Sequence, residues 1–136
     1  MDFAGINYLA VLVAAAASFF VGWPWYMTFS KPWLKATGKD PDTPPHPTPV
    51  PFLFLGVGLL VMAWVLAGLI GHLGQGQVTL WNGIVSGAFA WLGFVATTMA
   101  ANYAFQGRPF TLTLIDGGHF LLVLLVQGAI IGWFGV

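Results

Sequence analysis

The sequence predicts an all-α integral membrane protein, built as a bundle of four spanning helices. Of its 136 residues, 58% are hydrophobic and only 6% are charged, whereas soluble domains carry roughly 25% charged residues. Residues 3–30, 43–107 and 117–136 contain no Asp, Glu, Lys or Arg. This composition excludes a soluble domain, a disordered chain and an electrostatic nucleic-acid binder. Because the chain has no cysteine, disulfide scaffolds, thiolate metal sites and cysteine nucleophiles are excluded as well.

The apolar stretches divide into four spans. A spanning helix needs about 20 apolar residues, so the second stretch is long enough for two, and the glycine- and glutamine-rich segment 71–77 separates them. A β-barrel would require alternating apolar and polar residues, but residues 52–71 carry no polar side chain. We therefore predict one domain with up-down topology and spans over residues 5–29, 52–72, 80–105 and 110–134.

Residues 30–51 form the one sizeable polar segment. Six of the twelve residues from 40 to 51 are prolines, which favours an extended path. We interpret this loop as a stiff strap that returns the chain to the membrane, and a recognition segment for a partner is the alternative. Asp40, Asp42 and His46 are interpreted as solvated residues, and no metal site is predicted.

The basic residues predict the orientation. All four lie in the loops at 30–51 and 106–109, and none lies on the side of the termini: Lys31, Lys35, Lys39 and Arg108. The positive-inside rule places these loops in the cytoplasm and both termini outside. Aromatic residues at the same level are expected to mark the cytoplasmic interface: Trp23, Trp25, Tyr26, Trp33 and Tyr103.

Small residues recur at four-residue spacing in three of the predicted spans. Such residues let helix backbones approach each other in a membrane, where lipid supplies no hydrophobic drive for association. They fit an intramolecular bundle or a homo-oligomer equally well. The predicted packing residues are Ala14, Ser18, Gly22, Gly83, Gly87, Gly128 and Gly132.

The fourth predicted span carries a polar stripe. Asp116 is the one formal charge inside a predicted span, His119 follows three residues later, and Gln127 returns to nearly the same face after three turns. A carboxylate in lipid costs several kcal/mol, so it is expected to face the bundle interior and find partners. We therefore predict a polar site inside the membrane.

The partners of Asp116 are expected on the preceding hairpin. Thr98 lies level with it, Asn102 shares the face of Thr98, and Arg108 at the turn could reach back. In the structural interpretation Asp116 is a buried residue that holds neighbouring helices together. It is hydrogen-bonded by Thr98, Asn102 or His119 and paired with Arg108. In the functional interpretation Asp116 and His119 exchange protons.

Several short segments together suggest a family. Near the amino terminus these are Asn7, residues 22–26 (GWPWY), residues 31–35 (KPWLK) and Gly38. Near the carboxyl terminus they are residues 114–119 (LIDGGH) and 128–132 (GAIIG). The pattern resembles DUF1761, a family of small bacterial and archaeal membrane proteins of unknown function. The resemblance implies a four-helix fold, and it supplies no catalytic residues. We predict a location in the bacterial inner membrane. The proline-rich loop departs from the more charged connection expected in that family.

The motifs do not indicate an enzyme. The sequence contains no H-E-x-x-H, P-loop or G-x-S-x-G, and we predict no cofactor. The expected function is that of an inner-membrane protein in contact with the lipid bilayer. It would act as a self-associating homo-oligomer or as an accessory subunit of a larger membrane complex. The alternatives are a small dimeric proton-coupled transporter or channel using Asp116 and His119, and a pigment- or lipid-binding membrane protein.

Overall fold

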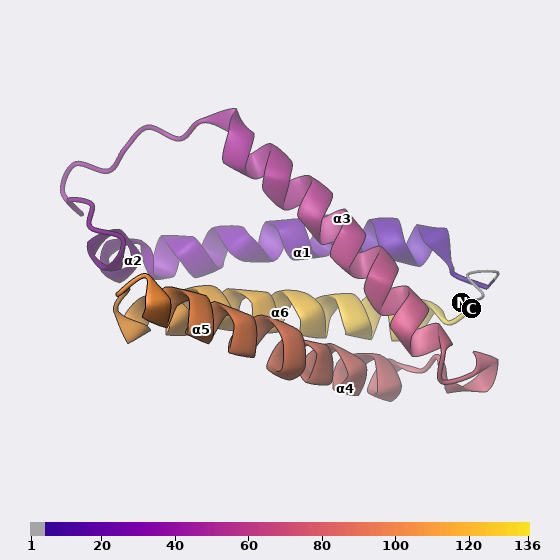
Figure 1. The fold of residues 1–136 in the computed structure, drawn as a ribbon. Coiled ribbons are helices and arrows are strands. Elements are labelled where there is room, and N and C mark those ends of the chain that lie inside the picture. Colours follow the sequence, from indigo (N-terminus) through magenta and orange to yellow (C-terminus); the bar gives the residue numbers. More distant parts are fainter. Residues whose placement is uncertain (1–4) are drawn as a thin grey trace.

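The computed structural model describes residues 5–136, and this part of the chain is helical with no strand. Four of its helical segments are long and apolar enough to cross a membrane, so the chain is an all-α membrane protein, as the sequence predicts (Figure 1). The elements in order are α1 (Tyr8–Thr28), α2 (Ser30–Ala36), α3 (Pro49–Gly71), the 3-10 turn η1 (Gln75–Gln77), α4 (Leu80–Ala90), the π-helical segment η2 (Trp91–Ala96), α5 (Thr97–Phe105) and α6 (Phe110–Phe134).

Polar side chains cap the amino-terminal ends of α1 and α4. The Asn7 side chain accepts a hydrogen bond from the backbone N–H of Ala10 and so caps α1. The Thr79 hydroxyl caps α4 by accepting from the N–H of Asn82. Each cap satisfies one of the N–H groups that the first turn of a helix leaves without a partner.

The loop after α1 is shorter than the sequence predicts. The expected extended strap at 30–51 is interrupted by α2, and α3 already begins at Pro49. The prolines do not prevent either helix because Pro32, Pro49 and Pro51 all fall in a first turn, where the missing N–H has no helical acceptor to lose. The connection between α2 and α3 therefore comprises residues 37–48 and includes turns at 37–38 and 41–42.

Helix α6 is the centre of the bundle. Of its most apolar window 44% is buried inside the chain, against 28% for α1, 28% for α3 and 6% for the span formed by α4, η2 and α5. The contact between α4 and α6 is made backbone to backbone. A Cβ added at Gly83 would overlap the carbonyl of Gly128, and one added at Gly87 would overlap the carbonyl of Leu124.

The structure places the predicted small packing residues between helices of one chain. Gly132 lies against the carbonyl of Thr79, and Gly22 lies against His119. All seven are buried: Ala14, Ser18, Gly22, Gly83, Gly87, Gly128 and Gly132. Their faces are thus occupied within the bundle, and they supply no separate surface for joining two copies.

Helix α3 leans away from the other long helices toward its amino-terminal end (Figure 1). Its later turns supply buried residues such as Leu59, Leu66 and Ile70, whereas Leu53 is 68% exposed and Phe54 is 75% exposed. The second half of α3 therefore holds it to the bundle, and the first half offers apolar surface to lipid.

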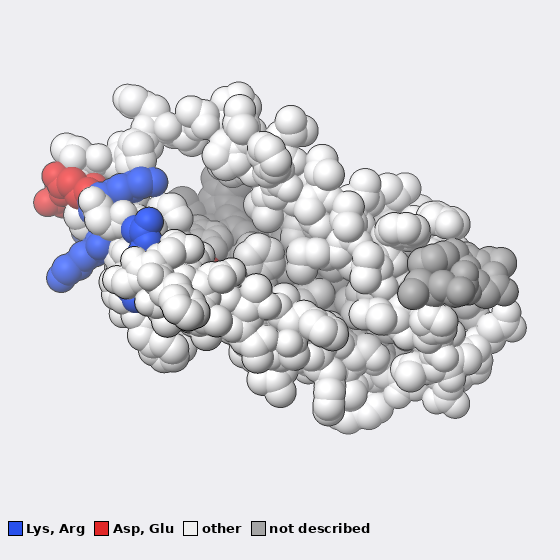
Figure 2. Space-filling view, viewed as in Figure 1, with Lys and Arg blue, Asp and Glu red and all other residues white. Residues whose placement is uncertain are grey.

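The exposed charged side chains of the described residues gather at one end of the molecule (Figure 2). This is the end that carries α2, the 37–48 connection and the turn between α5 and α6. At the opposite end Gly5 lies next to Val136, so the two ends of the described chain are neighbours there. The polar site described next lies toward the charged end, because α2 takes part in it.

Candidate functional site

Asp116 accepts three hydrogen bonds from aromatic side chains. The Tyr26 hydroxyl donates to Oδ1 at 2.7 Å, and the Trp33 indole N–H donates to the same oxygen at 3.0 Å. The Tyr103 hydroxyl donates to Oδ2 at 2.8 Å. Asp116 itself is only 8% exposed. These four side chains, which we call the Asp116 cluster, come from α6, α1, α2 and α5.

The Asp116 cluster stabilises a carboxyl group inside a membrane protein by hydrogen bonds and without a cation. All three donors are neutral, and each one offers an O–H or N–H that would itself be costly to bury unpaired. The carboxylate and its donors therefore satisfy each other. Because the donors lie on three different elements, the cluster also ties α1, α2 and α5 to the central helix α6.

The donors are not the residues that the sequence analysis expected. The Thr98 hydroxyl donates to the carbonyl of Phe94 in its own helix at 2.6 Å. Thr98, Asn102 and Arg108 are all exposed, and within residues 5–136 none of them bonds to Asp116. The expected pairing of Asp116 with Thr98, Asn102 or Arg108 is therefore corrected to Tyr26, Trp33 and Tyr103.

The π-helical segment η2 explains why the expected partners face away. Its wider turns rotate less per residue than an α-helix, so every residue after Ala96 is turned relative to a regular helix. As a result Met99 and Tyr103, four residues apart, face α6: the Met99 sulfur lies near Gly117, and Tyr103 reaches Asp116. In a regular helix the face would carry Thr98 and Asn102 instead.

Two tryptophans bind the backbone of α6 on either side of Asp116. The Trp25 indole donates to the carbonyl of Ile115 at 2.9 Å, and the Trp91 indole donates to that of Gly117 at 2.8 Å. The Trp25 ring fits because residue 118 is glycine: a Cβ there would lie 2.6 Å from the ring. Gly118 thus lets an indole from α1 reach the surface of α6.

His119 lies one turn beyond Asp116 and is 2% exposed. Its ring packs against Tyr26, with ring centroids 5.0 Å apart, and its Nε2 would be 3.1 Å from a Cβ at Gly22. Neither Nδ1 nor Nε2 has a hydrogen-bond partner among the described residues. His119 therefore does not bond to Asp116 here, although the two share the inner face of α6.

Gln127 forms a second polar tie, deeper in the bundle. Its Nε2 donates to the Ser18 hydroxyl and to the carbonyl of Leu59, both at 3.0 Å. Gln127 and Ser18 are both 0% exposed. The amide joins α1, α3 and α6, and its Oε1 has no partner among the described residues.

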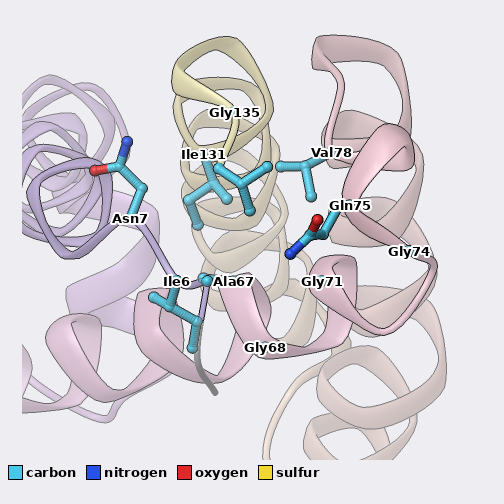
Figure 3. Close-up of a pocket in the computed structure, with 12 residues that line it drawn as sticks. Ile6, Asn7, Ala67, Gly68, Gly71, Gly74, Gln75, Val78, Ile131 and Gly135 are labelled. Carbon is cyan, nitrogen blue, oxygen red and sulfur yellow. The ribbon is translucent and has the colours of Figure 1, made fainter. Parts of the chain in front are cut away.

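A pocket of about 190 Å³ lies at the end of the bundle away from the Asp116 cluster (Figure 3). It is lined by the start of α1, the last turns of α3, the turn around Gln75 and the end of α6. Its polar side chains are Asn7, which already caps α1, and Gln75. Five glycines line it, so the pocket presents backbone and few side chains that could bind a ligand specifically.

The described residues contain no group of three or more His, Cys, Asp or Glu side chains that could hold a metal ion. The polar groups that the fold does collect are the Asp116 cluster, His119 and the Gln127 tie. All of them lie on the inner face of α6 or point at it.

Residues 9–132 match the sequence model described as a protein of unknown function, DUF1761. The chain belongs to the DUF1761 family. No curated protein and no solved structure matches it. The DUF1761 match covers nearly the whole chain, and it agrees with the resemblance noted in the sequence.

The segments that carried the DUF1761 resemblance meet in the structure. Residues 22–26 and 31–35 supply Trp25, Tyr26 and Trp33, and residues 114–119 supply the Ile115 carbonyl, Asp116 and His119. From the sequence, Tyr26, Trp33 and Tyr103 are expected only to mark the membrane interface. The missed signal was that three aromatic donors lie at the same level as the one membrane carboxyl.

Proposed function

We propose that this DUF1761 protein is a non-enzymatic protein of the bacterial inner membrane. It acts as a subunit, by associating with a second copy or with another membrane protein. The observation that carries the proposal is the bare surface of the span formed by α4, η2 and α5. Only 6% of its most apolar window is buried, against 28–44% for the other spans. The charged end, with its four basic residues, would face the cytoplasm.

The outer face of this span is rich in large apolar side chains. Trp81 is 71% exposed, Phe89 is 72% exposed and Leu92 is 58% exposed, and the three fall on one side of the helix. The glycines of α4 bind it to α6, so these bulky residues point the other way. Aromatic residues are the ones that most often anchor protein interfaces.

The test is the assembly state in lipid nanodiscs after extraction with a mild detergent. We expect particles larger than one copy, and we expect the double substitution Phe89→Ala and Leu92→Ala to weaken the assembly at least several-fold. Phe52→Ala with Phe54→Ala on α3 is the matched control, because those residues are also exposed. A monomer that copurifies with no other protein would overturn the proposal.

A second candidate function is proton-coupled transport, and His119 favours it. A buried polar group without a hydrogen bond costs about 1–3 kcal/mol, yet both ring nitrogens of His119 lack a partner among the described residues. This imidazole lies one turn from a membrane carboxyl. Protonation of Asp116 would weaken its bonds to Tyr26, Trp33 and Tyr103 and loosen α1, α2 and α5 together.

Proton uptake into liposomes loaded with a pH-sensitive dye tests this second candidate. With an inside-negative potassium diffusion potential, we expect the unaltered protein to acidify the lumen and Asp116→Asn to abolish the signal. Asp42→Asn, in the exposed connection, is the control and should leave the flux unchanged. If the unaltered protein carries no flux, or if Asp116→Asn carries the same flux, proton conduction through this site without a bound solute is excluded.

A further inference from the structure

An apolar groove runs along the outer surface of the bundle between α1 and α6. It has a volume of about 310 Å³ and is lined by Val21, Pro24, Trp25, Thr28, Phe29 and Leu122. The Thr28 hydroxyl donates to the carbonyl of Pro24, and the Trp25 N–H is turned away to the carbonyl of Ile115. The groove therefore presents no free hydrogen-bond donor, which suits a hydrocarbon chain and not a polar ligand.

Two lysines lie just beyond one end of this groove. Phe29 lines the groove, and Lys31 follows it by two residues, so their Cα atoms are within about 8 Å of each other. Lys35 is four residues after Lys31 on α2 and shares its face. Both are exposed, whereas Leu34 and Ala36 of the same helix are buried against the bundle. The outer face of α2 is thus cationic, and the inner face holds it to the protein.

Among residues 5–136, Lys31 and Lys35 form no ion pair with the nearby aspartates. Asp40 accepts hydrogen bonds from the N–H of Asp42 and the hydroxyl of Thr43, both at 2.9 Å, and these bonds hold the pKa of Asp40 below its ordinary value. Lys39, in contrast, lies 5.3 Å from the centre of the Trp33 ring. Figure 2 shows the cations collected at this end of the molecule, beside acidic side chains of the same end. The four basic residues there outnumber the two aspartates of the 37–48 connection, so this end carries a net positive charge.

We propose that this groove and these lysines form a binding site for an anionic phospholipid. One acyl chain lies in the groove beside Pro24 and Leu122, and the phosphate lies on Lys31 and Lys35. Charge complementarity selects an anionic headgroup, and the groove requires a molecule that also carries an acyl chain. The Asp116 cluster lies near the site: its Trp33 is on α2 with the two lysines, and Trp25, which forms a wall of the groove, donates to the carbonyl of Ile115 next to Asp116. The site is independent of the proposed subunit function.

The experiment counts lipids bound to the purified protein by native mass spectrometry. The protein in a non-ionic detergent is titrated with dioleoyl phosphatidylglycerol or with dioleoyl phosphatidylcholine. We expect the anionic lipid to bind roughly 30-fold better, because each of the two lysines contributes about 1 kcal/mol to attraction of an anionic headgroup. The substitution Lys31→Gln with Lys35→Gln should remove this preference, and Lys31→Arg with Lys35→Arg should keep it.

Two further arms separate the parts of the site. Val21→Phe, which fills the groove and leaves the lysines in place, should lower retention of both lipids. Glycerol phosphate, which has the headgroup charge without acyl chains, should not displace bound phosphatidylglycerol. Equal binding of the two lipids, an unchanged preference in the double glutamine variant, or displacement by glycerol phosphate would each overturn the proposal. A dimer whose interface covers the groove would overturn it as well.

Discussion

Replacing Asp116 with alanine is expected to destabilise the protein by about 2–4 kcal/mol. The substitution leaves the hydroxyls of Tyr26 and Tyr103 and the indole N–H of Trp33 without their acceptor. It also loosens α2, because α2 loses the bond from Trp33 to the carboxylate and keeps only the packing of Leu34 and Ala36. Equilibrium unfolding in mixed micelles measures the free-energy change, and hydrogen exchange over residues 30–36 measures the loosening of α2.

Two variants make this expectation specific. Asp116→Asn keeps one acceptor oxygen, so we expect it to lose less stability than Asp116→Ala. Asp42→Asn removes an exposed carboxylate that accepts none of these bonds and should leave stability unchanged. If Asp116→Ala unfolds at the same detergent composition as the unaltered protein, the hydrogen bonds of the Asp116 cluster do not stabilise the packing of α1, α2 and α5 on α6.

Gly83→Ala is expected to separate α4 from α6 and to cost about 1–3 kcal/mol. The added methyl group would overlap the carbonyl of Gly128, and a backbone carbonyl cannot move aside as a flexible side chain can. The helices must therefore shift apart along their whole contact, which includes Gly87 and Gly132. The same unfolding measurement reports the effect.

Gly58→Ala is the matched control for this second expectation. Gly58 lies in the regular helix α3, and a Cβ there would meet nothing within 4 Å. Both variants gain roughly the same helix propensity, up to about 1 kcal/mol as measured in soluble hosts, so the difference between them isolates the α4–α6 contact. A Gly83→Ala protein as stable as Gly58→Ala would mean that the two backbones are not in contact.

The sequence predicted the features that depend on composition and local pattern. Apolar length and missing charge predicted four spans, and these agree with the four long helical segments to within a few residues. Asp116, His119 and Gln127 were predicted to share a face of the last helix, and all three are buried in the bundle. Each of these features follows from hydropathy or from the period of the α-helix, which act along one stretch of chain.

What sequence could not predict was which residues meet across helices. Because of the π-helical segment η2, Tyr103 and not Asn102 faces Asp116. The composition of residues 91–96 does not predict this change of helix rotation. Nor could the sequence predict that α2 would place Trp33 on the same carboxylate. Hydropathy and charge are enough to predict a four-span helical membrane protein with one carboxyl group inside a span. The three aromatic partners of that carboxyl group follow from the tertiary structure, because contact between helices depends on their rotation and spacing and not on periodicity alone.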